Sequence, residues 1–197
     1  MTQALRIGIV VLLQTLALGA IVADRALILA TGREVVLETE PVDPRDLFRG
    51  DYVTLNYTAS QVDLGTVDGD DDGFATSKPA YVVFKDDGGT WRPAAIYHAR
   101  PASSALAAGE VAVKAAVVNV YTFSADDRWP RCPGGCDMVS LSYGVESYFV
   151  PEGTGEVLED ARNDRRLEVV VAVRGDGRAA IKALKVDGRT FAEEGLF

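Results

Sequence analysis

Residues 110–123 read EVAVKAAVVNVYTF, and this stretch decides which class of fold to expect. Apolar and β-branched side chains recur at alternate positions along most of it, which is the period of a β-strand with one buried face. The stretch is longer than the roughly 5–6 residues of an ordinary strand. We therefore expect a long strand that either bends or contributes to two sheets.

Further segments with the same period lie on both sides of this strand, separated by turns of Gly, Pro and Asp. The sequence GDGR at 175–178, between two apolar runs, is a strong hairpin signal. A chain of about eight such strands predicts a mainly β domain, either a sandwich or barrel-like. The expected strands are residues 33–42, 51–59, 80–85, 90–99, 110–123, 138–150, 167–174 and 179–186.

One substantial helix is expected in this domain, at residues 154–166. Its acidic residues come early and its arginines late, which suits the helix dipole, and Thr154 is the expected N-cap. Residues 43–50, DPRDLFRG, predict one additional helical turn that ends at Gly50. The expected apolar stripe of the longer helix consists of Val157, Leu158 and Ala161.

The N-terminus contains an apolar run at residues 7–23, broken only by Gln14 and Thr15. As a helix the run would measure roughly 26 Å, the short end of what crosses a bilayer core. We expect residues 1–31 to form a retained single-pass anchor and residues 32–197 an extracytoplasmic, periplasmic β-rich domain, with the positive N-terminus inside. A cleaved signal peptide and a buried helix of a soluble protein are the alternatives.

Charge limits the partners of the domain. The chain has 197 residues and a formal net charge of −9, with a pI near 4.6. A negative domain repels phosphates, so we expect no nucleic-acid partner. Attachment to a membrane would have to be hydrophobic, through the N-terminal helix.

The two cysteines, Cys132 and Cys136, flank Pro-Gly-Gly in RCPGGCDM. In an oxidising envelope we expect them to close a small structural disulfide loop. The alternatives are a redox dithiol, which usually has two residues between its cysteines, and half of a metal site. Zinc would need four ligands, and His98 is the only histidine of the chain.

One acidic pattern resembles the start of a calcium loop. In DGDDDG, Asp68, Asp70 and Asp72 occupy alternate positions and Gly73 follows them, as in the first half of an EF-hand loop. The twelfth position would be Pro79, which cannot supply the closing carboxylate. We therefore expect a solvated acidic loop and no cofactor, and the alternative is weakly bound calcium at these aspartates.

Residues 49–57 read RGDYVTLNY and combine a sharp turn with a strand. In a strand, Asp51, Val53, Leu55 and Tyr57 share one face, which we expect to point inward. The hydroxyl of Tyr57 would then need a hydrogen-bond partner.

The same stretch resembles a known signature. Gly50-Asp51-Tyr52, followed by Leu55 and Tyr57, match position for position the motif of the GDYxxLxY family of bacterial membrane-anchored proteins. The resemblance implies one N-terminal hydrophobic segment followed by a β-rich extracytoplasmic domain. Further segments similar to this family are residues 41–49 and 148–156.

That resemblance supplies no catalytic residues, because the family has no established activity. Its genes are described beside those of multi-pass membrane proteins, which implies a multi-pass membrane protein as partner. Two hypotheses explain the motif. Asp51 pairs with Arg45 or Arg49 to fix the turn against the strand, or Arg49, Asp51 and Tyr52 form a binding surface.

The chain lacks the residues that most enzyme classes require. A signal-peptidase-like site needs a serine near the membrane with a lysine base, yet the first serine, Ser60, follows the Gly-Asp turn. A serine triad would depend on His98, and no G-x-S-x-G elbow occurs. Paired carboxylates remain, such as Glu146 and Glu152 in the acidic segment 146–159.

We therefore expect a non-enzymatic, membrane-tethered envelope domain that docks onto a membrane protein or a cell-surface component. The alternatives are an envelope hydrolase that uses acidic residues, and a weak calcium-binding domain.

Overall fold

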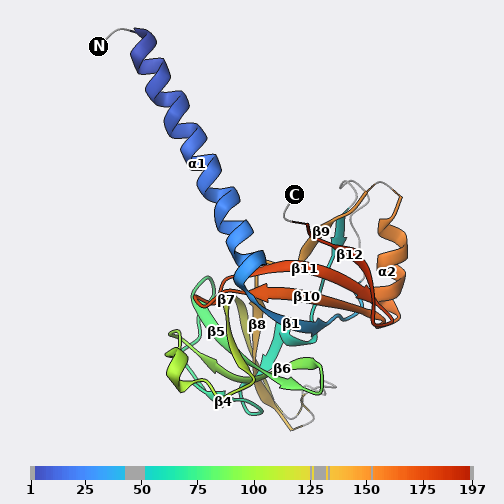
Figure 1. Ribbon diagram of the computed structural model, residues 1–197. Helices are drawn as coiled ribbons and strands as arrows, with labels where there is room; N and C mark the ends of the chain where they lie inside the picture. The colour runs from blue at the N-terminus through green and yellow to red at the C-terminus, as the bar shows by residue number, and fades with distance from the viewer. Residues whose placement is uncertain are drawn as a thin grey trace.

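The computed structural model consists of one long N-terminal helix and a β-rich body at its lower end (Figure 1). Helix α1 (Gln3–Thr31) is long and apolar enough to cross a membrane by its length and composition. The structure describes residues 3–42, 52–124, 126, 132, 134–151 and 153–195.

The strand that follows α1 and the three strands nearest the C-terminus form a four-stranded antiparallel sheet in the order β1-β10-β11-β12. Its members are β1 (Arg33–Glu38), β10 (Leu167–Val173), β11 (Ala179–Val186) and β12 (Arg189–Glu193). The first and last parts of the body thus share one sheet. The GDGR sequence connects β10 to β11, which confirms the predicted hairpin.

The middle of the chain forms a six-stranded sheet in the order β3-β8-β7-β5-β6-β4. Only the short pair of β4 and β6 is parallel. The long strand β7 spans the expected residues, and its pairing with β8 shifts between Val117 and Asn119, so it bends within one sheet. The members are β3 (Gln61–Asp63), β4 (Asp68–Gly69), β5 (Pro79–Asp87), β6 (Thr90–Tyr97), β7 (Glu110–Phe123) and β8 (Cys136–Ser142).

Smaller elements complete the body. A ribbon of β2 (Tyr52–Thr54) and β9 (Ser147–Phe149) lies beside helix α2 (Gly155–Asn163). Two single 3₁₀ turns, η1 (Thr58–Ser60) and η2 (Ser103–Ala105), lie in the connections.

One hydrophobic cluster joins the inward faces of the two larger sheets and the apolar side of α2. The mainly β fold is therefore confirmed, with a packed core between sheets as alternating strands require. Side chains of this core with no exposed surface include Val35, Val82, Phe84, Ile96, Val139, Leu158 and Leu184.

Several element boundaries differ from those expected. The strand expected at 51–59 is only three residues long, and the one expected at 138–150 is divided into β8 and β9. Strands β3, β4 and β12 were not predicted, because segments of two to five residues carry too little periodic signal. The helical turn expected at 43–50 lies outside the described residues.

Helix α2 occupies the expected region but differs in two details. Thr154 makes no side-chain cap, and its hydroxyl donates to the carbonyl of Pro151 at 2.7 Å. Leu158 and Ala161 are buried as expected, whereas Val157 is exposed. The helix therefore presents a narrower apolar stripe to the core than its sequence suggests.

The lower end of α1 belongs to the body. Ile28 is buried against Ala172 of β10 and Ala180 of β11. Gly32, which follows the helix, has no room for a side chain, since a Cβ there would lie 2.5 Å from the Ile28 carbonyl oxygen. The helix thus meets the four-stranded sheet by close packing.

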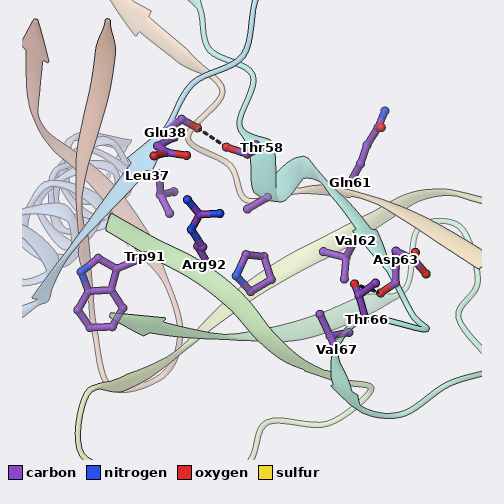
Figure 2. A pocket seen from close by; sticks show the side chains of 12 residues that line it. Leu37, Glu38, Thr58, Gln61, Val62, Asp63, Thr66, Val67, Trp91 and Arg92 are labelled. Carbon is purple, nitrogen blue, oxygen red and sulfur yellow. Dashed lines mark hydrogen bonds between the residues drawn. The ribbon is translucent and has the colours of Figure 1, made fainter. Parts of the chain in front are cut away.

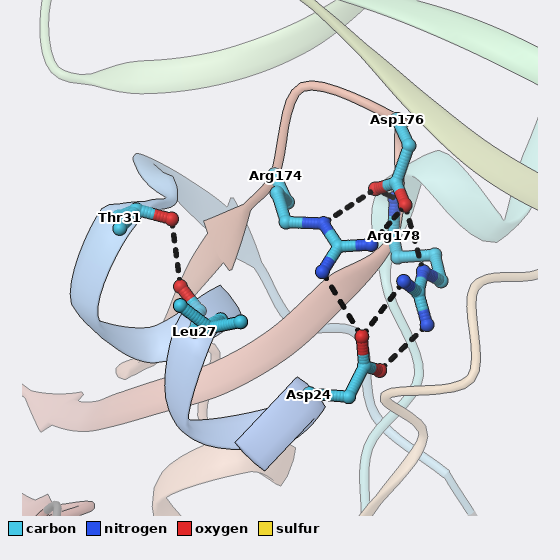
Figure 3. Close-up of polar contacts among 6 residues, drawn as sticks. All are labelled: Asp24, Leu27, Thr31, Arg174, Asp176 and Arg178. Carbon is cyan, nitrogen blue, oxygen red and sulfur yellow. Dashed lines mark hydrogen bonds and ion pairs between the residues drawn. The ribbon is translucent and has the colours of Figure 1, made fainter. Parts of the chain in front are cut away.

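Four charged residues reinforce this junction (Figure 3). The carboxylate of Asp24 on α1 accepts hydrogen bonds from Arg174 and Arg178, which flank the hairpin turn. Asp176, within the turn, pairs with both arginines. A hydrogen bond to Asp176 is the main reason why the pKa of Arg174 is raised above its usual value.

Candidate docking cleft

A cleft of about 260 Å³ opens where the two larger sheets meet (Figure 2). Three strands contribute to it: β1 from the four-stranded sheet, and β3 and β6 from the six-stranded sheet. The turn η1 closes one side. The lining residues are Leu37, Glu38, Thr58, Ala59, Gln61, Val62, Asp63, Thr66, Val67, Trp91, Arg92 and Pro93.

The cleft lies at strand edges. Strand β1 is an end strand of the four-stranded sheet, and β3 is an end strand of the six-stranded sheet. Strand β6 pairs with β4 only at Ala95 and Ile96, so the part that holds Pro93 lies beyond that pairing. Proline has no N–H to donate and is tolerated on such edges. Its presence in the expected strand 90–99 was the one sequence signal for this edge.

The walls of the cleft combine apolar and charged groups. Arg92 extends into the opening beside Pro93, toward Glu38 and Thr58 (Figure 2). Its side chain is 64% exposed, and its Nε lies 3.4 Å from a carboxylate oxygen of Asp87. The guanidinium is therefore held at one point and still open to a ligand. Asp63 supplies a carboxylate on the other side of the cleft.

Trp91 supports the cleft from behind. Its indole is 8% exposed, and the guanidinium of Arg33 lies 5.1 Å from the ring centroid. Such a cation over an aromatic face is favourable and keeps the ring in place.

The hydroxyls of the cleft are engaged with the backbone. Thr58 donates to the carbonyl of Glu38 at 3.2 Å, and Thr66 donates to the carbonyl of Asp63 at 2.9 Å. Nucleophilic catalysis needs a hydroxyl held by a base, and neither threonine is arranged in that way. The arrangement fits binding by apolar contact, charge and hydrogen bonds.

Those residues of the GDYxxLxY-like motif that the structure describes have mainly a structural role. Val53, Leu55 and Tyr57 are buried, which confirms the predicted inward face. The hydroxyl of Tyr57 donates to the carbonyl of Val145. Burial first, and then the charge of Glu146, raise the pKa of Tyr57 well above its usual value. The phenol therefore stays neutral and acts as a hydrogen-bond donor in the core.

Of the three residues predicted as a binding surface, only Tyr52 can be placed. It is half-buried in β2 and pairs with Phe149 of β9, with ring centroids 6.0 Å apart. Arg49 and Asp51 lie outside the described residues, and so does Arg45. Both hypotheses for Asp51 stay predictions.

Sequence reasoning missed Arg162 on α2, whose side chain is fully buried. Its guanidinium donates to the carbonyls of Thr54 at 2.6 Å and Val42 at 3.1 Å, and to the side chain of Asn163. These two carbonyls flank the segment that contains the GDY triplet. Burial lowers the pKa of Arg162 from its usual value, and the charge of Glu159 opposes that shift. Arg162 is the single arginine of α2, and it lies four residues after Leu158 and next to Ala161, so helical spacing on the expected apolar stripe was the signal for its burial.

The acidic loop uses one of its aspartates to hold the histidine. Asp70 accepts the backbone N–H of His98 at 2.7 Å, and its carboxylate lies 2.6 Å from His98 Nδ1. Phe74 stacks on the imidazole with ring centroids 4.3 Å apart. Within the described residues, the carboxylates of Asp68, Asp70 and Asp72 do not gather within 4.8 Å of one another. Calcium binding there stays a prediction, which calorimetry with millimolar calcium would test.

Cys132 and Cys136 lie at disulfide distance, as predicted, with Cα atoms 5.6 Å apart. A carboxylate oxygen of Asp63 lies within 4.8 Å of both sulfur atoms. The pair closes the turn that leads into β8 and does not begin a helix, unlike the dithiols of redox enzymes.

The acidic residues considered for hydrolysis are placed only in part. Glu146 accepts the backbone N–H of Tyr143, and its own carbonyl accepts the N–H of Leu55. The hydroxyl of Tyr143 donates to the carbonyl of Ala59 at 2.6 Å, and burial raises its pKa. Glu146 therefore organises the ribbon around the motif. Glu152 lies outside the described residues.

Comparison with known protein families gives one match, which covers most of the chain. A family model described as GDYXXLXY protein matches residues 14–184. No curated protein and no solved structure matches the chain.

Proposed function

The chain belongs to the GDYXXLXY protein family, and from that premise we propose that it is a membrane-tethered envelope domain that docks onto a membrane protein. The observation that carries the proposal is the junction between α1 and the body. The apolar helix continues without a break into residues that the β-sheet holds in place.

Length supports a tether of this kind. The 29 residues of α1 measure roughly 43 Å at about 1.5 Å per residue, against about 30 Å for the hydrocarbon core of a bilayer. The apolar run ends at Ala23, and the next residue, Asp24, already binds Arg174 and Arg178. The body would therefore stand at the membrane surface without a flexible linker. In the proposed topology the N-terminus stays in the cytoplasm and the body is periplasmic.

The cleft is the proposed docking site. Its open strand edges suit an extended segment of a partner, because main-chain groups at an edge can pair with another strand. Arg92, Glu38 and Asp63 would select the charges of that segment, and the apolar wall would accept a side chain. The proposed segment is an extracytoplasmic loop of a multi-pass membrane protein.

Affinity isolation tests the docking. The intact protein is crosslinked in membranes and recovered, and we expect a reproducible multi-pass membrane protein with it. The variant Arg92→Glu should lose that partner with an unchanged melting temperature, because Arg92 is exposed and its salt bridge contributes little to stability. Arg189→Glu is the matched control, since it makes the same charge change at an exposed position on β12. Recovery of the same partner with both variants would exclude the cleft.

Protease treatment tests the topology separately. Protease added to sealed spheroplasts should digest the body, while a cytoplasmic marker stays intact. Protection of the body would contradict the periplasmic location. N-terminal mass analysis of the mature chain decides between a retained anchor and a cleaved signal peptide, since only the anchor keeps residues 7–23.

A further inference from the structure

Exposed large apolar side chains are few in the described part of the body, and they are grouped here by the elements that carry them. One group lies on β7. The other lies on β9, α2 and β12 and is called here the upper apolar patch. The β7 group is Val118, Val120 and Tyr121, and the upper apolar patch is Phe149, Val157 and Phe191.

Phe149 is the most exposed of these side chains, at 80%. It packs at a tilt against Tyr52 of the family motif. The strand beneath it is firmly held, because Tyr148 is buried and hydrogen-bonds Glu194 just after β12. An exposed apolar residue marks a contact surface where others lie beside it, and Glu194, which Tyr148 contacts, brings the end of β12 next to β9.

The position of the upper apolar patch indicates which surface it contacts. In Figure 1, the end of β9, the C-terminal end of β12 and the start of α2 lie on the side of the body toward which α1 rises. The junction at Asp24 and Ile28 fixes that orientation. A helix that crosses a bilayer would bring this side of the body to the lipid surface.

The length of α1 beyond the apolar run sets how close the body comes to the lipid. Only residues 24–32 separate the apolar run from β1, and residues 24–31 among them form about 12 Å of helix. The polar headgroup region on each side of a bilayer is roughly 5–7 Å thick, as the difference between its total and hydrocarbon thickness shows. The base of α1 therefore lies about 5–7 Å beyond the headgroup region, and a side chain on the α1 side of the body has to extend across that gap to reach the depth at which aromatic residues are enriched in membrane proteins.

Charge argues against an electrostatic contact. Glu156, Glu193 and Glu194 are exposed beside the upper apolar patch, and the whole chain carries −9. A contact of this composition would form by apolar insertion into a neutral lipid surface, and salt would have little effect on it.

We propose that the upper apolar patch, with Phe149 at its centre, inserts into the headgroup boundary of the membrane that α1 crosses. The inference rests on the proposed tether and adds a second contact to it. Two contacts, the helix and the patch, would hold the body in one orientation and keep the cleft at a constant height above the lipid.

Fluorescence of the full chain in phosphatidylcholine vesicles tests the insertion. Phe149→Trp adds a tryptophan in the upper apolar patch, and Tyr121→Trp is the matched control. Tyr121 is also an exposed aromatic residue, near the end of β7. That strand starts at Glu110, which Arg33 contacts beside α1, and it runs to the disulfide turn. Equal melting temperatures of the two variants establish that both fold.

With lipids brominated near the top of their chains, most of the emission added by Trp at position 149 should be lost, at low and high salt alike. Emission added at position 121 should persist. If the chains float with the vesicles and the emission added at positions 149 and 121 persists equally, the patch does not contact the lipid. That result would overturn this inference and would leave the proposed membrane tether unaffected. Failure of the chain to float would overturn both.

Discussion

The carboxylate of Asp24 accepts two hydrogen bonds from the guanidinium of Arg178, at 2.6 and 2.8 Å, across 154 residues of sequence. Arg174 donates a further one to the same carboxylate at 2.9 Å. A residue of the N-terminal helix is thereby bound to a hairpin near the C-terminus. This contact joins the lower end of the apolar helix to the domain.

The first prediction concerns this contact. Asp24→Asn keeps the size of the side chain and removes its charge. Because the three partners are partly exposed, we expect the free energy of unfolding to fall by only about 1 kcal/mol. Proteolysis between residues 24 and 32 should increase, since the end of α1 is held less firmly. Denaturant unfolding in detergent and limited proteolysis measure the two effects.

Asp187→Asn is the matched control, because Asp187 forms an exposed ion pair with Arg166 away from α1. It should leave proteolysis at residues 24–32 unchanged. The same cleavage in both variants would show that Asp24 does not hold the helix.

The second prediction concerns Tyr57 of the family motif. Tyr57→Phe removes the hydroxyl that donates to the Val145 carbonyl in the core. A buried acceptor left without a donor costs about 1–3 kcal/mol, so the free energy of unfolding should fall by that amount. Tyr121→Phe, at an exposed position, should change it by less than about 0.5 kcal/mol. Equal effects of the two substitutions would contradict a structural role of the motif tyrosine.

The third prediction concerns Arg162. Arg162→Met fills a similar volume and leaves the carbonyls of Val42 and Thr54 without their donor. We expect a loss of about 3 kcal/mol in the free energy of unfolding, with the first changes in hydrogen exchange at β2. Arg162→Lys should recover only part of the loss, because one ammonium group cannot reproduce the planar fork. Arg189→Met, exposed on β12, should be nearly neutral. Full stability of Arg162→Met would show that the two carbonyls find other donors.

The fourth prediction concerns pH. The N–H of His98 first, and then its side chain, hold the pKa of Asp70 below its usual value. The folded state therefore binds this proton less readily than the unfolded state, whose carboxyl titrates near pH 3.9. The stabilising contribution of Asp70 is present above about pH 4 and is lost as the pH falls through the lowered pKa of the folded state.

Thermal unfolding from pH 6 to pH 2.5 tests this sign. The native chain should be more stable than Asp70→Asn above about pH 4, and the difference should shrink toward lower pH. A difference that grows on acidification would contradict the assignment. Asp72→Asn serves as control, since Asp72 is exposed in the same loop.

Much of the local structure could be predicted from the sequence. The alternation in residues 110–123 identified β7, GDGR identified the hairpin, and the motif strand showed which side of Val53, Leu55 and Tyr57 would be buried. These features depend on the period of side chains along a strand and on the conformations open to glycine, so a few neighbouring residues suffice to determine them.

The partners of these elements were decided only by the tertiary structure. The carbonyl that receives the Tyr57 hydroxyl, the arginines that bind Asp24, and the two carbonyls held by Arg162 are 88 or more residues away in sequence. The cleft exists because edges of β1, β3 and β6 meet, and β1 belongs to a different sheet from β3 and β6. Strand order and register determine which strand edges lie next to one another. Both follow from packing the whole chain around one core, which no short stretch of sequence contains.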